Sequence, residues 1–257
     1  MVERATALLG LSRQRALALA ALLAALVTWE AAGGAAPGLP HWADVAFISA
    51  LLIPLTFAVP WLLSPLAHAR SDANAWVPLA AGVVGFASLA VVLRLIGAGS
   101  LFNVAKLLAL TLAGFALMQV FEILAPVVLI AVLIPGLDAL SVWRGPTRAV
   151  VDNEPGLFEL VAINFRVPGS EGGAGLGPPD ILFFALFLAA SLKFALRPRT
   201  TWWAMAALLG LTLVLIAVFD IDGLPALPAV AFGFLFANLD LLWPRLKADR
   251  ATLKSAK

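Results

Sequence analysis

Residues 123–138 read ILAPVVLIAVLIPGLD, an apolar run that ends in a carboxylate, and residues 180–192 read DILFFALFLAASL, an apolar run that begins with one. A helix needs about 20 predominantly apolar residues to span the hydrocarbon core of a bilayer. A carboxylate at that depth costs free energy and is usually paired, hydrated or functional. Asp138 and Asp180 therefore mark both a membrane fold and a candidate site.

The composition of the whole chain is that of a membrane protein. Of its 257 residues, 62% are hydrophobic and only 12% are charged, and the mean hydropathy is +1.00. A soluble domain carries about 25% charged residues. The short alternating segments of a β-barrel are absent from the sequence. The sequence therefore predicts an all-α polytopic protein of the cell membrane, with the lipid bilayer as its surroundings.

Several classes of site are excluded by residue counts. The chain has no cysteine and only two histidines, His41 and His68. We therefore expect no disulfide, no thiolate nucleophile and no metal or other cofactor held by histidines. The isoelectric point is about 9.4, but the basic residues lie near the ends of apolar segments and form no stripe. Nucleic acid is therefore not an expected partner.

Eight apolar segments are predicted to span the membrane, with nine as the alternative count. They cover residues 16–32, 45–67, 75–95, 101–121, 123–143, 180–196, 201–219 and 224–243. The fourth and fifth are separated only by Glu122. The first begins like a signal peptide, but its apolar core is long, so we expect a retained helix.

Lysine and arginine in short connections predict the orientation, because they favour the cytoplasmic side. They cluster before residue 16, between residues 193 and 199, and after residue 244. With eight spans, both termini are then cytoplasmic and the loop at residues 144–179 is extracytoplasmic. We divide the chain into N-terminal scaffold helices (1–121), a second transmembrane region that carries both aspartates and the loop at 144–179 (122–243), and a basic cytoplasmic tail (244–257).

The two aspartates are expected to lie at similar depth on adjacent antiparallel helices. Asp138 precedes the outer loop by about six residues, or roughly 9 Å at 1.5 Å per residue. Two carboxyl groups that meet tend to share one proton. The ionised group can then take a proton from water while the protonated group polarises a peptide carbonyl. This is aspartyl protease chemistry, which needs no metal or cofactor.

Three stretches carry a family resemblance, and they read LDALSVWRGPTR at 137–148, LGPPDILFF at 176–184 and LPALP at 224–228. They resemble, in order, the Tyr-Asp helix end with its basic-Gly-Pro-x-Arg turn, the Gly-x-Gly-Asp motif and the Pro-Ala-Leu motif of the presenilin and signal peptide peptidase family of intramembrane aspartyl proteases. The resemblance covers about half of the chain. Leu137 replaces the family's tyrosine and Pro179 its second motif glycine, and the family has nine spans.

The resemblance implies a presenilin-like bundle with Asp138 and Asp180 as the catalytic dyad. It also implies that Gly177, Pro225, Ala226 and Leu227 line the substrate site. The expected substrates are transmembrane peptides such as signal-peptide remnants. The predicted loop orientation matches signal peptide peptidase, since presenilin is oriented oppositely.

Other interpretations stay open at this point. The carboxylates could serve a proton-coupled transporter or channel, or the chain could be a catalytically silent protein that binds membrane helices. Asp138 could simply pair with Arg144 or Arg148, and Asp180 could be a helix N-cap.

Two features of the long loop give further expectations. The β-prone stretch 160–167 is a candidate strand for pairing with an unwound substrate, or else an amphipathic surface segment. The glycines at 172, 173, 175 and 177 are expected to form a flexible hinge before Asp180.

Overall fold

The structure is a computed structural model, and it describes residues 11–68, 76–145, 156, 160–169, 173–219, 221 and 224–255. The elements in chain order are α2 (Arg13–Ala32), η1 (Gly33–Ala35), α3 (His41–Phe47), η2 (Ile48–Leu52), α4 (Ile53–His68), α5 (Trp76–Leu95), α6 (Gly99–Gln119), α7 (Leu124–Arg144), β1 (Ile163–Arg166), β2 (Gly173–Leu176), α10 (Pro178–Lys193), α11 (Pro198–Phe219) and α12 (Leu227–Ser255).

The predicted helical membrane fold is confirmed. Within the described ranges, seven helices are long and apolar enough to cross a membrane, at 13–35, 41–67, 76–95, 99–119, 124–144, 198–219 and 227–248. The remaining predicted span, 180–196, corresponds to α10, which has only 16 residues and so rises about 24 Å. The predicted break near Glu122 is present, because α6 ends at Gln119 and α7 begins at Leu124.

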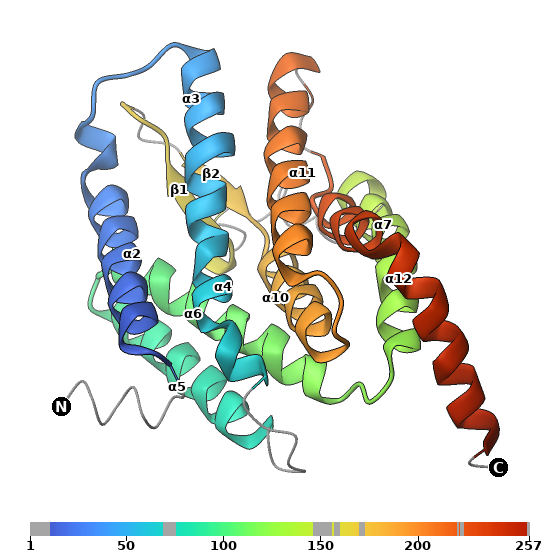
Figure 1. Cartoon of the computed structure of the whole chain (residues 1–257). Coiled ribbons are helices and arrows are strands. Elements are labelled where there is room, and N and C mark those ends of the chain that lie inside the picture. The colour runs from blue at the N-terminus through green and yellow to red at the C-terminus, as the bar shows by residue number, and fades with distance from the viewer. Residues whose placement is uncertain are drawn as a thin grey trace.

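The basic segments gather on one side of the molecule. Figure 1 shows the start of α2, the turn between α10 and α11, and the end of α12 all in its lower half. The β-hairpin lies in the upper half, beside α2 and α4. The three basic segments therefore share one side of the helix bundle, and the membrane face on which they lie stays a prediction.

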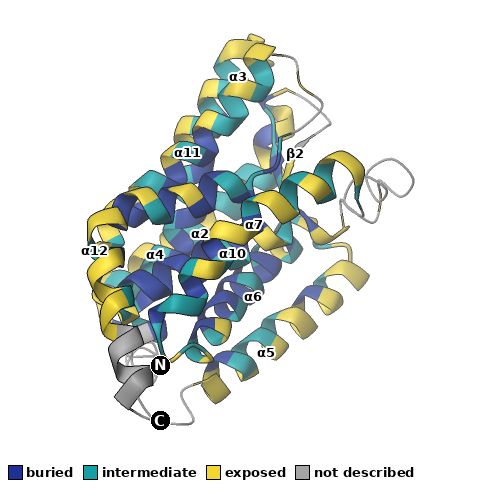
Figure 2. Ribbon diagram, turned by 90° about the vertical axis from the view of Figure 1, so that its right-hand side faces the viewer, coloured by how far each residue is buried: buried dark blue, intermediate teal, exposed yellow. Residues whose placement is uncertain are grey.

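The short helix α10 forms the centre of the bundle. It contacts α4, α6, α11 and α12, and most of its residues are buried, whereas α5 exposes most of its surface (Figure 2). Phe184 stacks on Phe57 of α4 with ring centroids 3.9 Å apart, and Phe187 stacks on Phe234 of α12 at 4.8 Å. The helix that carries Asp180 is therefore surrounded by protein.

A glycine permits the closest approach to α10. A Cβ atom added at Gly114 of α6 would collide with the carbonyl oxygen of Leu182 and would lie 2.8 Å from the Cβ of Ala185. Small residues at such crossings are typical of membrane bundles, where lipid supplies no hydrophobic drive for helix association and close packing must do so.

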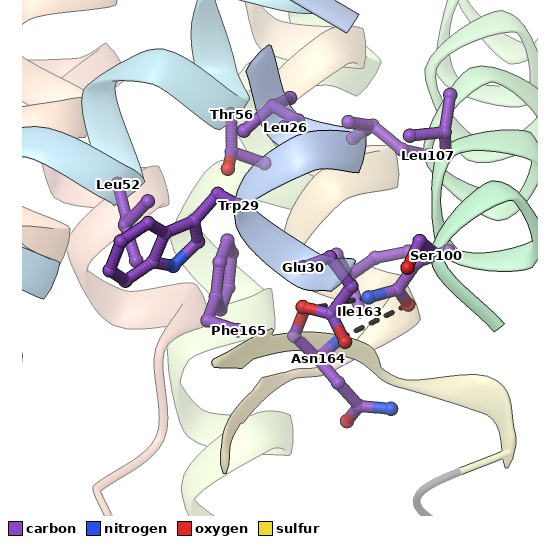
Figure 3. Close-up of a pocket in the computed structure, with 12 residues that line it drawn as sticks. Leu26, Trp29, Glu30, Leu52, Thr56, Ser100, Leu107, Ile163, Asn164 and Phe165 are labelled. Atoms are coloured by element: carbon purple, nitrogen blue, oxygen red, sulfur yellow. Dashed lines mark hydrogen bonds between the residues drawn. The ribbon is translucent and has the colours of Figure 1, made fainter. Parts of the chain in front are cut away.

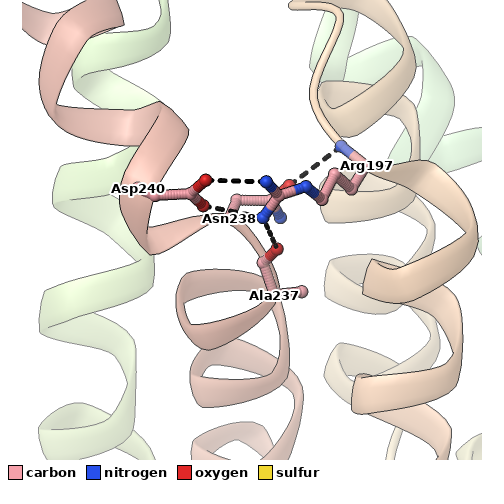
Figure 4. Close-up of polar contacts among 4 residues, drawn as sticks. All are labelled: Arg197, Ala237, Asn238 and Asp240. Carbon is pink, nitrogen blue, oxygen red and sulfur yellow. Dashed lines mark hydrogen bonds and ion pairs between the residues drawn. The ribbon is translucent and has the colours of Figure 1, made fainter.

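A polar cluster joins the turn between α10 and α11 to α12 (Figure 4). Arg197 donates to both carboxylate oxygens of Asp240, at 2.7 and 2.6 Å, near the surface. The fully buried Asn238 lies beneath this pair and accepts from the backbone N–H of Arg197 at 2.9 Å. Its amide nitrogen donates to the Thr201 hydroxyl and to the carbonyl of Phe234, both at 2.8 Å. One side chain thus makes three hydrogen bonds, two of them fully buried.

We expect Asn238→Ala to lower the free energy of unfolding by about 1–3 kcal/mol, because it leaves buried polar groups without a partner. Asp240→Asn should cost less, since the Arg197–Asp240 pair is 47% and 60% exposed at its side chains and water replaces part of the interaction. Unfolding in a detergent titration, followed by circular dichroism, measures both. Equal losses of unfolding free energy in the two variants would contradict the interpretation that the buried Asn238 amide contributes more than the Arg197–Asp240 ion pair.

The long loop contains a β-hairpin rather than one strand and a hinge. The β-prone stretch is confirmed as a strand over Ile163–Arg166, where β1 pairs antiparallel with β2. The register sets Ile163 against Leu176 and Asn164 against Gly175. The prediction of a flexible glycine hinge is wrong for Gly173–Leu176, which form β2. Ladder hydrogen bonds from β1 override the low strand propensity of glycine there.

Candidate active site

Asp138 lies near the end of α7 and contacts the first residue of α12. Its Oδ2 accepts the backbone N–H of Leu227 at 3.0 Å, and its side chain is half-buried. The N–H groups of a first helical turn have no partner inside the helix, so a carboxylate there satisfies one of them and interacts favourably with the helix dipole. The Pro-Ala-Leu stretch is therefore in direct contact with the first predicted aspartate.

The ion pair considered for Asp138 is not formed with Arg144. Both residues belong to the described part of α7, and no ion pair joins them there. The second considered partner, Arg148, lies outside the described residues. Among the described residues, the contact that holds Asp138 is thus with the backbone of α12.

Asp180 lies in the first turn of α10, and its residue is only 8% exposed. Its Oδ2 accepts the backbone N–H of Gly177 at 3.0 Å, and its own N–H donates to the Gly177 carbonyl at 3.1 Å. Gly177 is the N-cap of α10 and Asp180 is the third residue of the helix. The idea that Asp180 is the N-cap is therefore wrong, because its carboxylate reaches back to the cap as in a capping box.

The two prolines fit this turn without distortion. Pro178 and Pro179 occupy the first two positions of α10, where a backbone N–H would have no intrahelical partner and proline is tolerated. A Cβ added at Gly177 would lie 3.1 Å from Oδ2 of Asp180, which is closer than ordinary contact. The glycine at this position thus leaves room for the carboxylate.

The structure places the two aspartates on helices that contact each other. α7 and α10 are in contact, and the carboxyl groups of Asp138 and Asp180 are near enough for their charges to interact. Of the predicted substrate-site residues, Gly177 binds Asp180, and Leu227 binds Asp138. Pro225 is buried and Ala226 half-buried beside them in the chain. Two fixed carboxyl groups at a protein-covered position can exchange protons with a water molecule and a carbonyl group.

Side chains from α2 and α6 hold the outer edge of β1 (Figure 3). Asn103 donates to the Asn164 carbonyl at 2.6 Å and accepts the Asn164 N–H at 3.2 Å. The indole N–H of Trp29 donates to the carbonyl of Arg166 at 3.1 Å. The backbone of β1 is therefore occupied on both sides, by β2 and by these side chains.

Sequence reasoning missed the role of Lys106. Its ammonium group is buried and donates to the carbonyls of Leu160, at 3.0 Å, and Ala162. It also lies 4.3 Å from the centroid of the Phe102 ring. The available signal was the spacing of Asn103 and Lys106, which puts both on one face of an otherwise apolar helix.

The register of the hairpin identifies its outward-facing groups. Because the N–H and C=O of Asn164 point to Asn103, the pair Asn164 and Gly175 is a non-hydrogen-bonded pair of the ladder. The N–H and C=O of Gly175 then point away from β1. No third strand covers that edge of β2 among the residues that the structure describes. β2 leads through Gly177 directly into Asp180.

Comparisons with protein-family models, with curated proteins and with solved structures give no match for this chain.

Proposed function

We propose that this protein is an intramembrane aspartyl endopeptidase that hydrolyses peptide bonds in transmembrane segments with Asp138 and Asp180 as its dyad. The observation that carries the proposal is the proximity of these two carboxyl groups on helices that contact each other, one carboxyl group held by Leu227 and the other by Gly177. The resemblance of the three surrounding stretches to the presenilin and signal peptide peptidase family supports the same function.

The chemistry requires one ionised and one protonated carboxyl group. The ionised group takes a proton from water, and the resulting hydroxide adds to the scissile carbonyl carbon while the protonated group gives its proton to the carbonyl oxygen. The carboxyl group that took the proton from water then gives it to the amide nitrogen, the other carboxylate takes a proton back from a hydroxyl group of the tetrahedral intermediate, and the C–N bond breaks to release an amine and a carboxylic acid. The two protons belong to the pair, so neither aspartate is assigned a fixed role.

The substrate must be extended at the cleavage site, because the backbone of a helix shields its own peptide bonds. We propose that the unwound substrate adds as a strand to β2 rather than to the stretch 160–167, since both sides of β1 are already bonded. A peptide that adds as a strand bonds to the backbone N–H and C=O groups that point outward from the edge strand of a sheet. The backbone N–H and C=O of Gly175 point outward from β2 in this way, and Gly175 lies five residues before Asp180.

Gly175→Pro provides a test of this strand addition. Proline removes the outward N–H of residue 175 but none of the ladder bonds to β1. We expect cleavage to fall at least about tenfold, by loss of one hydrogen bond and of edge access. Ala174→Pro is the matched control for the fold, because Ala174 faces Phe165 in the hydrogen-bonded register and its change should disrupt the hairpin itself. Full cleavage by folded Gly175→Pro would contradict the assignment of the edge.

The function is tested by incubating the purified protein in liposomes with a labelled transmembrane peptide and identifying the products by mass spectrometry. We expect cleavage within the hydrophobic segment, without added metal. A peptide analogue with a hydroxyl-bearing carbon in place of the scissile carbonyl should compete, because it mimics the tetrahedral intermediate. Intact peptides across several substrate sequences, together with proton uptake by the same liposomes, would favour a proton relay instead.

A further inference from the structure

A cavity of about 370 Å³ lies between α4 and α11. It is lined by Ala58, Trp61, Arg199, Trp202 and Trp203. Its volume falls within the range of small-molecule sites, about 300–1,000 Å³. We call it the indole cavity, since three tryptophans form its walls. None of its residues takes part in the candidate active site.

The walls of the indole cavity are fixed in place. Trp202 donates its indole N–H to the carbonyl of Phe57 at 2.8 Å. Trp203 packs edge-on against it, with centroids 4.6 Å apart at 85°, and Trp61 lies 6.4 Å away. A ligand would therefore meet a preformed apolar surface, which lowers the entropy cost of binding.

The charge at the cavity is uncompensated. Arg197, two residues away, is neutralised by Asp240, whereas Arg199 makes no ion pair with any carboxylate of the described chain. Arg199 also lies in the first turn of α11, so the positive end of the helix dipole adds to its charge. The site thus combines a free guanidinium group with an apolar slot.

We propose that the indole cavity binds an anionic phospholipid, with the phosphate at Arg199 and the glycerol and upper acyl chain against the indole rings. The turn between α10 and α11 is on the predicted cytoplasmic side, where the leaflet is rich in anionic lipids and tryptophans favour the headgroup level. Basic pockets between membrane helices on that side suit such headgroups. The proposal does not depend on proteolytic activity.

The test is native mass spectrometry of the full-length protein released from detergent with equal amounts of phosphatidylglycerol and phosphatidylcholine. We expect one phosphatidylglycerol to be retained preferentially. Arg199→Gln should lower that preference about fivefold, the usual contribution of one basic residue at an anionic surface. Arg245→Gln, at an exposed position of α12 outside the cavity, should leave it unchanged. If both variants lose the preference for phosphatidylglycerol equally, the lipid is attracted by the basic surface in general, and the proposed site at Arg199 is wrong.

A second pair of variants tests the walls. Trp203 and Trp243 are 64% and 61% exposed, but only Trp203 lines the cavity, so Trp203→Leu should reduce retention and Trp243→Leu should not. Equal retention of both lipids by the parent protein would overturn the preference for an anionic headgroup. If excess inorganic phosphate displaces the retained lipid, the proposal that the ligand is a lipid is wrong, and the site binds a free anion instead.

Discussion

Asp138→Asn and Asp180→Asn should each abolish cleavage of a transmembrane peptide, with rate losses on the order of 10³-fold or more, because in the proposed mechanism the two groups act as one unit in proton transfer. Asparagine keeps an acceptor oxygen in the same place. The hydrogen bonds from Leu227 and Gly177 can therefore persist, and only the ability to exchange a proton is lost. Single-turnover cleavage in liposomes measures the effect.

Matched variants separate chemistry from folding. Glu122→Gln removes an exposed acid in the turn between α6 and α7 and should leave the rate unchanged. Asp138→Leu should also lose activity, and additionally stability, because the Leu227 N–H then has no acceptor. Residual cleavage of more than a tenth of the parent rate in either asparagine variant would contradict the dyad, provided that circular dichroism shows the same helix content.

Gly114→Leu should have the largest effect on stability, lowering the free energy of unfolding by about 3 kcal/mol or more. Even a methyl group at this position would collide with the backbone of Leu182 and with Ala185. Backbone cannot move aside as a flexible side chain can, so α6 and α10 must separate. Asp180 lies two residues before Leu182, so the same change should displace the carboxylate and reduce cleavage.

Gly85→Leu is the control for this prediction. Gly85 lies on the exposed helix α5, where an added Cβ would meet nothing within 4 Å. The variant should therefore keep the parent stability in the same detergent titration. If both leucine variants unfold alike, the loss comes from replacing a helical glycine in general, and the close approach of α6 to α10 does not control the fold.

The sequence by itself determined the membrane fold and the positions of its helices. Long apolar runs can satisfy their backbone groups in a bilayer only as helices, so each predicted segment has a helix in the structure. Lysine and arginine residues in the short connections predicted which helix ends lie on the same side of the bundle. The rarity of carboxylates in apolar runs singled out Asp138 and Asp180 without any knowledge of packing.

Only the tertiary structure decided how the candidate site is held together. The bond from Leu227 to Asp138 joins residues 89 positions apart, and no local pattern encodes such a contact. The strand β2 was missed because glycines have low strand propensity and the stretch pairs only through its partner β1. Lys106 and Asn103 acquired their roles in the same way, since the carbonyl groups that they bind come from a distant loop. Local periodicity fixes helices, whereas long-range hydrogen bonds depend on which helices pack together.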